Sequence, residues 1–266
     1  MPAVRTPAGQ AGLAALLADP SHALVALDYD GTLAPVVARP EDAVIAHGAT
    51  DVLARLAGLV GRVGLVTGRP AAVAVELGGL ADIPGLVVMG QYGVERWHDG
   101  TLHSPEPDAG IAEARGALPQ IVGPVGAALE DKGQSLVVHT RNAPDPVGVQ
   151  QQLAVPLAEL AVRTGLELHP GRFVLELRPA GFDKRGGLLA LAEPRPSAVL
   201  FAGDDIGDAP AFDAVEELRQ QGVPGLTVFS DSAEGPAALR ERADLVVDGP
   251  AGVVELLDEL VRELTR

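Results

Sequence analysis

Residues 22–32 read HALVALDYDGT, and this stretch decides the fold. The apolar run from His22 to Leu27 has the length and continuity of a strand buried on both faces of a parallel sheet. Asp28 and Asp30 follow directly, so both carboxylates leave the carboxyl end of the strand, where open α/β sheets bind ligands. Two like charges this close resist joint ionisation unless a cation lies between them. The stretch therefore predicts a metal-assisted site for phosphoryl transfer.

The composition predicts a soluble, cytoplasmic protein with a substantial core. The chain has 266 residues, of which 47% are apolar, and this length suits one large domain or two modest ones. Its apolar runs are too short to span a bilayer, and the segment from Gly9 to Leu17 lacks the long apolar core of a signal peptide. The chain has no cysteine, which excludes disulfides, thiolate nucleophiles and zinc–sulfur sites.

The net charge of the chain limits the kinds of molecule that it can be expected to bind. A formal net charge of −16 argues against nucleic acid and against anionic membranes, which both attract basic surfaces. A phosphate substrate can still bind where positive charge is concentrated locally. Of the 20 basic residues only Lys132 and Lys184 are lysines. Because lysine is a compact point charge and arginine a planar fork, we infer that these two positions require the ammonium group.

Strand and helix patterns alternate in the first and last parts of the chain. Such alternation predicts an α/β fold, a Rossmann-like parallel sheet with right-handed crossovers. The expected strands cover residues 24–27, 62–66, 86–89, 198–202, 226–229 and 245–247, with a hairpin at 94–97 and 101–103; the expected helices cover 46–60, 71–77, 183–192, 211–219 and 253–264.

The rhythm changes after the turn-rich segment from Ser104 to Asp108. Helices are expected at 111–121 and 147–164, and strands at 125–129, 135–139, 166–169 and 173–177. This αββαββ pattern of about 75 residues has the size of a small α+β domain. The sequence therefore predicts a core made of residues 1–104 and 181–266, with residues 105–180 inserted as a cap domain.

Three expected core strands end in polar groups. Asp28 and Asp30 follow the first, Thr67 follows the strand at 62–66, and Asp204 and Asp205 follow the strand at 198–202. In one parallel sheet these ends share an edge. Lys184 begins a helix that leads into the Asp204 strand, so it can reach the same crevice. Each motif alone has an ordinary structural explanation, but the four together indicate a single catalytic site.

This set resembles, motif for motif, the haloacid-dehalogenase-like (HAD) phosphotransferase superfamily. The resemblance implies that Asp28 is the nucleophile and forms an aspartyl-phosphate, and that Asp30 is the general acid and base. It implies that Mg²⁺ is held by the Asp28 carboxylate, the backbone carbonyl of Asp30 and the carboxylate of Asp204. The phosphoryl group would be held by Thr67 and Lys184. Further support for the metal would come from Asp205 and Asp208.

The inserted segment is similar to that of the trehalose-6-phosphate phosphatases. The similarity rests on residues 130–141 (EDKGQSLVVHTR), on 176–179 (ELRP), on Asp183-Lys184 and on 203–208 (GDDIGD). It implies hydrolysis of trehalose 6-phosphate, with a functional pairing to a trehalose-6-phosphate synthase, in a monomer. The substrate-binding residues that it implies are Gly68, Arg69, Glu130, Lys132, Arg141 and Glu176.

Departures from the family pattern leave other functions open. Gln91-Tyr92 stands where the family commonly has Asn or Ala followed by His, and Thr140 replaces a usual tyrosine. Both border the expected leaving-group pocket, so the substrate could be another glycoside phosphate, such as that of sucrose, glucosylglycerol or a pseudo-sugar. A mutase would use the same aspartates. A non-catalytic sensor of sugar phosphate is disfavoured because Asp28 and Asp30 are both present. The six histidines show no spacing typical of metal ligands.

Overall fold

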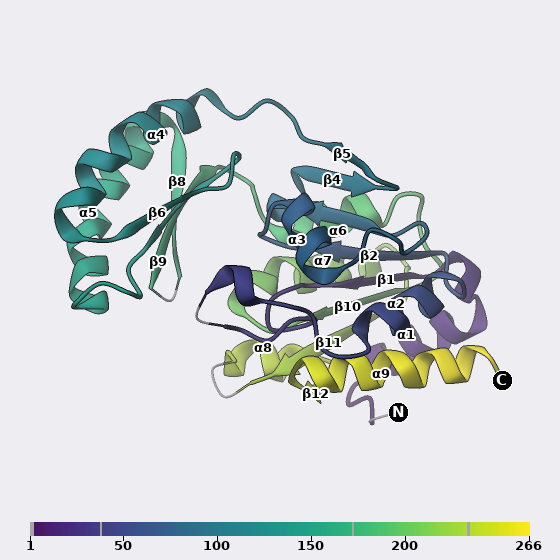
Figure 1. Cartoon of the computed structure of the whole chain (residues 1–266). Coiled ribbons are helices and arrows are strands. Elements are labelled where there is room, and N and C mark those ends of the chain that lie inside the picture. Colours follow the sequence, from purple (N-terminus) through teal and green to yellow (C-terminus); the bar gives the residue numbers. More distant parts are fainter. Residues whose placement is uncertain (1–2, 38, 172, 233–234) are drawn as a thin grey trace. The chain divides into compact units, whose positions relative to one another are not determined.

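The computed structural model describes residues 3–37, 39–171, 173–232 and 235–266. The chain folds into two compact units, the first made of Met1–Ser104 and Asp183–Arg266 and the second of Pro105–Phe182. The sequence predicted an inserted segment of residues 105–180, and the second unit ends two residues later, at Phe182. Each unit has a sheet of its own (Figure 1).

The first unit is built on an eight-stranded sheet with the order β12-β11-β10-β1-β2-β3-β4-β5. The strands from β12 to β3 run parallel, and β4 and β5 add an antiparallel edge. After β1 the chain adds β2 and β3 on one side of it, and later adds β10 and β11 on the other side. The carboxyl end of β1 therefore lies at a topological switch point, where open α/β sheets bind ligands. In chain order the elements are α1 (Pro7–Ala18), β1 (Leu24–Leu27), α2 (Ala49–Ala57), β2 (Arg62–Val66), α3 (Ala71–Gly78), β3 (Val87–Gly90), β4 (Glu95–His98), β5 (Thr101–His103), α6 (Lys184–Leu191), β10 (Val199–Gly203), α7 (Ala209–Gln220), β11 (Gly225–Asp231), α8 (Ala237–Arg242), β12 (Leu245–Asp248) and α9 (Gly249–Leu264).

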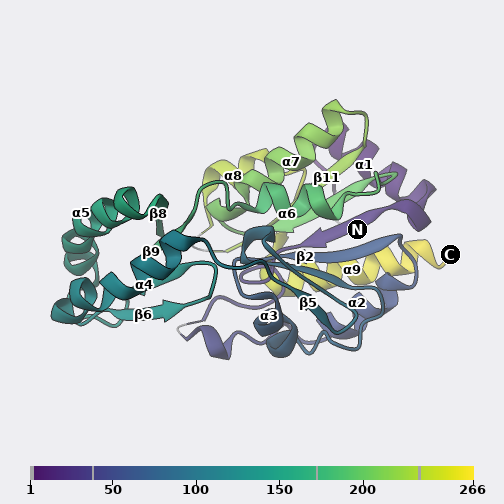
Figure 2. The same cartoon turned by 90° about the horizontal axis from the view of Figure 1, so that it is seen from above.

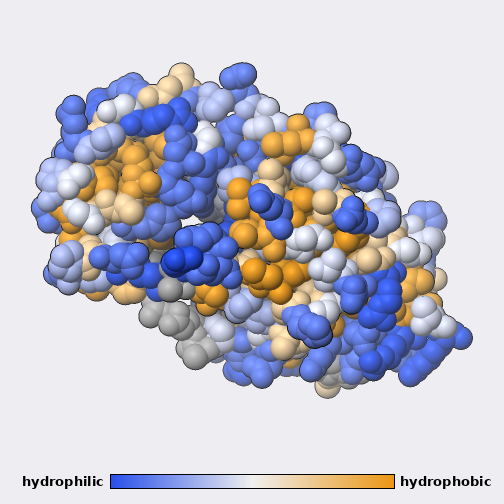
Figure 3. All heavy atoms as spheres, viewed as in Figure 1, coloured by the Kyte–Doolittle hydropathy of each residue, from blue (hydrophilic) through white to orange (hydrophobic). Residues whose placement is uncertain are grey.

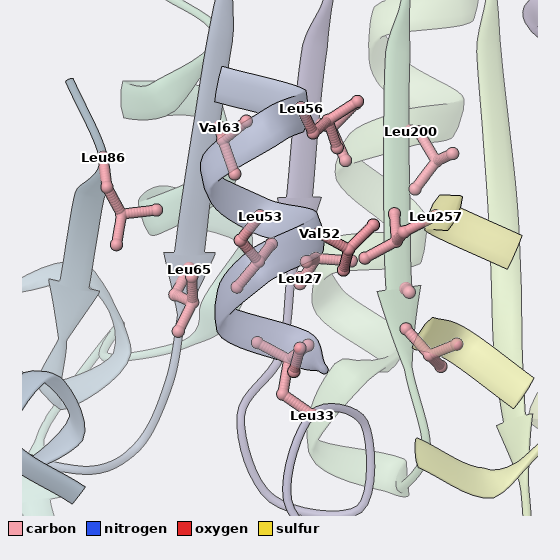
Figure 4. Packing of buried hydrophobic residues seen from close by; sticks show 14 of the residues in the cluster. Leu27, Leu33, Val52, Leu53, Leu56, Val63, Leu65, Leu86, Leu200 and Leu257 are labelled. Atoms are coloured by element: carbon pink, nitrogen blue, oxygen red, sulfur yellow. The ribbon is translucent and has the colours of Figure 1, made fainter. Parts of the chain in front are cut away.

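Helices cover both faces of this sheet, so its central strands are buried on both sides. Val25 and Leu27 of β1 face a core shared with α1, α2, α3 and α9, part of which Figure 4 shows. Leu24 and Ala26 face the opposite core, shared with α6, α7 and α8. Seen from above, α2, α3 and α9 lie on one side of the sheet and α6, α7 and α8 on the other (Figure 2). This double burial explains why β1 is apolar without alternation.

The second unit is a four-stranded antiparallel sheet with the order β6-β7-β9-β8. Two helices pack on one of its faces against Leu136, Val138, Leu175 and Leu177. Because side chains alternate along a strand, the residues between these leucines and valines face the other side. The elements are α4 (Ala109–Val122), β6 (Ala128–Asp131), β7 (Leu136–His139), α5 (Pro146–Thr164), β8 (Leu166–Gly171) and β9 (Val174–Pro179).

The predicted fold class is confirmed, including the αββαββ order of the inserted unit. Several boundaries differ from those expected, and one helix was not expected. The helix expected from Ala46 begins at Ala49, because Gly48 before it has a φ of +80°. The strand expected at 125–129 is β6, displaced toward the C-terminus by a 3-10 turn at Gly123–Val125. Helix α8 was not predicted, since six residues are too few to show a periodic pattern.

Much of the visible surface is hydrophilic. Figure 3 shows hydrophilic side chains spread over the visible face of the molecule, with smaller hydrophobic patches between them. Among the residues that the structure describes, no helix combines the length and apolar character needed to cross a bilayer.

Candidate active site

The register of the large sheet places three of the predicted site residues side by side. Leu27 of β1 pairs with Leu65 of β2 on one side and with Ala202 of β10 on the other. The backbone N–H of Asp28 donates to the carbonyl of Ala202 at 2.9 Å, which continues the ladder past the end of β1. Asp28, Thr67 and Asp204 therefore leave three adjacent strands at the same edge.

Three carboxylates meet at this edge. One oxygen from each of Asp28, Asp204 and Asp208 lies within 4.8 Å of the other two, and all three residues are buried. Asp28 follows β1, Asp204 follows β10, and Asp208 ends a 3-10 turn (Ile206–Asp208) before α7. The sequence predicted Asp28 and Asp204 in this cluster as metal ligands and Asp208 as a supporting residue.

Lys184 lies against the same cluster. Its Nζ is 2.5 Å from Oδ1 of Asp28 and 2.7 Å from Oδ1 of Asp208. Lys184 is the first residue of α6, and the Asp183 side chain caps that helix by accepting from the N–H groups of Arg185 and Gly186. Burial alone would lower the pKa of Lys184, but the carboxylates of Asp208 and Asp28 outweigh it and raise that pKa well above its ordinary value. The ammonium therefore stays charged beside the expected nucleophile.

Asp208 also organises the backbone around the cluster. Its Oδ2 accepts from the N–H of Asp204 at 2.9 Å and from the N–H of Asp205 at 3.1 Å. In return, the Asp205 carboxylate accepts from the N–H of Asp208, and also from the N–H of Gly207 at 2.8 Å. These reciprocal bonds form a capping box that fixes the turn after β10. Asp208 thus helps to fix the backbone from which the Asp204 side chain extends.

The cluster carries more negative charge than its surroundings neutralise. Burial, followed by repulsion from Asp208, raises the pKa of Asp28 well above its ordinary value, although Lys184 acts in the opposite direction. Burial, with repulsion from Asp208 and Asp205, raises the pKa of Asp204 to about 8. Three carboxylates and one ammonium leave two negative charges, which a divalent cation would balance. Oxygen donors of this kind suit a hard cation such as Mg²⁺. The residues present therefore fit a divalent metal.

Asp30 lies in a different environment from the other acids. Its carboxylate forms an ion pair with Arg69 and is about two-fifths exposed. Among the described residues, it is not one of the three carboxylates whose oxygens meet at the strand edge.

The loop after β2 is hydrogen-bonded to the turn at Gln91-Tyr92, a contact that the sequence did not predict. The hydroxyl of Thr67 accepts from the N–H of Arg69 at 3.1 Å. The carbonyls of Thr67 and Arg69 accept from the N–H groups of Tyr92 and Gln91, at 2.9 and 2.8 Å. Gln91 and Tyr92 both have left-handed backbone, with φ of 49° and 62°, and a side chain on Gly68 would meet the Tyr92 ring. This strained turn supports the phosphate-binding loop expected from the sequence.

Ser230 is a second residue that sequence reasoning missed. It lies near the end of β11, is fully buried, and donates through Oγ to the carbonyl of Gly31 at 2.6 Å. A polar residue just after the predicted strand 226–229 is the same signal that identified Thr67, so Ser230 could have been found. Its hydrogen bond fixes the turn that carries Asp28 and Asp30.

Gly31 is required at this turn for two reasons. Its φ of +76° lies in the left-handed region, and a Cβ at this position would overlap the carboxylate of Asp204. If the cluster carries out the phosphoryl transfer expected from the sequence, Gly31→Ala should lower the turnover of a phosphate ester at least ~100-fold, because the new Cβ would displace Asp204 of the cluster. The substitution should also destabilise the protein by about 1–3 kcal/mol. Phosphate-release kinetics and thermal unfolding would measure the two effects.

Gly100→Ala is the matched control for Gly31→Ala. Gly100 has a nearly identical φ of +77°, but open space surrounds its expected Cβ. This variant should lose about 1 kcal/mol of stability and keep its activity. If Gly31→Ala were no more harmful to turnover than Gly100→Ala, the contact between Gly31 and Asp204 would not matter for the site.

The second unit gathers a separate group of charged side chains on the face of its sheet away from the helices. Glu176 of β9 accepts from the Ser135 hydroxyl at 2.7 Å, with Lys132 Nζ at 3.8 Å and Arg178 Nη1 at 3.5 Å. The register aligns Glu130 of β6 with the same row across the sheet. Three of the predicted substrate-binding residues, Glu130, Lys132 and Glu176, therefore share this face.

Two other side chains of the second unit have partners that the sequence did not suggest. His139 Nε2 lies 2.7 Å from Oε2 of Glu130, although the sequence gave this histidine no role. Arg141, predicted to bind substrate, is exposed and lies over the ring of Phe173 at 5.4 Å from its centroid. Thr140, which departs from the family pattern, is fully buried.

Comparison with known proteins identifies the family. The trehalose-phosphatase family model matches residues 26–244. A trehalose-phosphate phosphatase of Mycobacterium bovis is 34% identical over 254 residues, which cover 90% of this chain and 61% of the relative, so the chain spans about three-fifths of that protein's length. Among solved structures, the C-terminal domain of the Candida albicans trehalose-6-phosphate phosphatase superposes with a TM-score of 0.79 at 19% identity and covers 97% of each chain.

A structure described as a haloacid dehalogenase-like hydrolase from Bacteroides thetaiotaomicron also matches, with a TM-score of 0.65 at 15% identity over 90% of this chain and 99% of that one. These structural likenesses establish the fold, and the family model covers all three residues of the carboxylate cluster. The chain belongs to the trehalose-phosphatase family.

Proposed function

We propose that this protein is a divalent-metal-dependent phosphatase that hydrolyses trehalose 6-phosphate to trehalose and phosphate. The observation that carries the proposal is the buried cluster of Asp28, Asp204 and Asp208 around the ammonium of Lys184. Such a cluster is costly to bury in an apolar core, and strongly perturbed buried carboxylates are typical of functional sites. Membership of the trehalose-phosphatase family supports the choice of substrate.

The proposed reaction has two displacements at phosphorus. In the first, a carboxylate oxygen of Asp28 attacks the phosphorus and the bond to the sugar oxygen breaks. Asp30 gives its proton to the departing sugar oxygen, so the product leaves as an alcohol. In the second, water attacks the phosphorus of the aspartyl-phosphate, Asp30 takes the proton of that water, and the bond to Asp28 breaks to release phosphate.

Other core residues hold the phosphoryl group during both steps. The ammonium of Lys184 and the hydroxyl of Thr67 lie at the strand edge and donate to phosphoryl oxygens, with Gly68 and Arg69 in the same loop. Mg²⁺, held by Asp28, Asp204 and the carbonyl of Asp30 and supported by Asp205 and Asp208, would stabilise the negative charge that shifts during transfer.

The second unit is proposed to recognise the sugar. Glu130, Lys132 and Glu176 offer carboxylates and an ammonium that suit the many hydroxyl groups of a disaccharide, and Arg141 adds a further donor. A related glycoside phosphate is the second candidate, because Thr140 replaces the usual tyrosine and Gln91-Tyr92 replaces the usual pair of residues. The cytoplasmic location, the monomeric state and the functional pairing with a trehalose-6-phosphate synthase are parts of the same proposal.

A phosphate-release panel tests the proposed substrate. Trehalose 6-phosphate would be compared with sucrose 6-phosphate, glucosylglycerol phosphate and glucose 6-phosphate, each with Mg²⁺. The proposal predicts the highest kcat/KM for trehalose 6-phosphate. A higher value for another glycoside phosphate would replace the substrate but keep the reaction, and conversion to an isomeric sugar phosphate without phosphate release would indicate a mutase.

Lys132→Ala tests the role of the second unit. Lys132 approaches Glu176 in the group on the sheet face, and the variant would lose a donor to the sugar. We expect kcat/KM for trehalose 6-phosphate to fall by ~10–100-fold, the value of one to two charge-assisted hydrogen bonds, while a small generic phosphoester is affected less than ~3-fold.

Arg163→Ala is the control for Lys132→Ala. Arg163 lies on α5 of the same unit and forms an exposed ion pair with Glu113. Its loss should leave both substrates unaffected. Equal losses on both substrates for Lys132→Ala would reject a role for Lys132 in sugar recognition.

A further inference from the structure

The guanidinium of Arg69 donates hydrogen bonds to both carboxylate oxygens of Asp30. Its Nε lies 2.7 Å from Oδ2 and its Nη2 lies 2.7 Å from Oδ1. This two-point geometry is the strongest that an arginine and a carboxylate form, and it fixes the plane of the carboxylate as well as its position. Asp30 thus has a single defined orientation, although its side chain is 41% exposed.

Arg69 is itself held on several sides. Its Nη1 donates to the carbonyl of Pro40 at 2.9 Å, and its Cζ lies 5.3 Å from the ring centroid of Tyr29. Tyr29 is fully buried, and its hydroxyl donates to the carbonyl of Ala43 at 2.9 Å. The guanidinium side chain is only 12% exposed. The plane of the guanidinium is therefore held by contacts other than Asp30. A flexible lysine could not reproduce its two hydrogen bonds to Asp30.

We propose that Arg69 is a positioning residue for the general acid Asp30. This inference rests on the proposed function. An acid that must deliver a proton to the sugar oxygen gains from a fixed orientation, because proton transfer needs a well-directed hydrogen bond. When Asp30 is protonated, one N–H group of Arg69 keeps its hydrogen bond to the unprotonated oxygen and maintains the orientation of the carboxyl group. The other N–H group releases the oxygen that carries the proton. This role differs from the direct substrate contact that the sequence resemblance implied for Arg69.

The two roles predict different dependence on the leaving group. A sugar alkoxide leaves poorly without a proton, so its departure depends on Asp30. The para-nitrophenolate ion is stable without a proton, so its departure does not. If Arg69 acts through Asp30, its loss should matter only for the sugar phosphate. If Arg69 binds the phosphoryl group, its loss should matter equally for both, because both substrates carry that group.

The experiment compares Arg69→Ala with the parent protein on trehalose 6-phosphate and para-nitrophenyl phosphate. The quantity is kcat/KM, which reports the steps up to transfer of the phosphoryl group. We expect a fall of ~100-fold for the sugar phosphate, within the usual range for general acid catalysis, and less than ~5-fold for the aryl phosphate. Retained aryl phosphatase activity also shows that the variant is folded.

Three companion variants sharpen the comparison. Arg69→Lys should recover only part of the loss, since one ammonium cannot hold both oxygens. The double variant of Arg69→Ala with Asp30→Asn should be within ~3-fold of Asp30→Asn alone, because residues that act as a unit are not additive. Arg55→Ala, which removes the ion pair between Arg55 of α2 and Asp258 of α9, should leave the activity on both substrates unchanged.

The outcomes separate this inference from the proposed function. Equal losses on both substrates, or additive losses in the double variant, would overturn the role of Arg69. If Asp30→Asn is itself selective for the sugar phosphate, the proposed function stands and only the inference fails. If Asp28→Asn keeps its activity, or Asp30→Asn shows no dependence on the leaving group, the proposed mechanism fails first.

Discussion

Asp28→Asn is expected to reduce phosphate release from trehalose 6-phosphate by at least ~1,000-fold. The amide is close in size to the carboxylate but cannot form the aspartyl-phosphate, so the two-step route is lost as a whole. The variant should remain folded. Burial and repulsion from Asp208 already raise the pKa of Asp28, so a neutral side chain there relieves an unfavourable charge.

The control for this result is Asp51→Asn, which changes an exposed acid in the first turn of α2. It should match the parent protein in activity and melting temperature. Activity of Asp28→Asn above a tenth of the parent value would mean that another group attacks the phosphorus. A large fall in melting temperature would mean that the loss of activity reflects unfolding.

Removal of divalent metal is expected to lower activity at least ~100-fold and to change the pH dependence of stability. Burial, followed by repulsion from Asp208 and Asp205, raises the pKa of Asp204 to about 8 in the folded chain, against an unfolded value near 4. Because the folded value is the higher one, the stabilisation is complete below about pH 4 and is lost as the pH rises to about 8. The metal-free protein should therefore lose on the order of a few kcal/mol over this range.

Thermal unfolding of the chelator-treated protein and of Asp204→Asn would measure this effect. The variant should be the more stable of the two at pH 8, and the two should converge at pH 4. Mg²⁺ at 100 times its Kd should stabilise the parent protein by about 2.7 kcal/mol, and should stabilise the variant far less. Identical curves for parent and variant in chelator, with no response to Mg²⁺, would contradict a metal site at this cluster.

Much of the fold could be predicted because strong local signals agreed with one another. The apolar runs before Asp28, Thr67 and Asp204 each form a parallel strand, and their order in the chain fits a doubly wound sheet. The edge at which these three side chains meet followed from that topology alone. The carboxylate cluster was accessible to sequence reasoning for the same reason, since it lies at strand ends.

The parts that could not be predicted depend on contacts between distant segments. Arg69 meets Asp30 across 39 residues, and Ser230 meets Gly31 across 199. Nothing in the local pattern of either pair specifies its partner. The left-handed turn at Gln91-Tyr92 was also hidden, because neither residue is a glycine that would signal positive φ. Long-range hydrogen bonds and strained turns therefore account for the second layer of the site.

Trapping the phosphorylated enzyme tests the central claim most directly. The protein would be mixed briefly with trehalose 6-phosphate and Mg²⁺, quenched in acid, digested, and examined by peptide mass spectrometry. A transient phosphoryl group on Asp28, absent from Asp28→Asn, is the predicted result. Steady release of phosphate with no phosphorylated peptide at any quench time, or with the group on a different residue, would contradict the account.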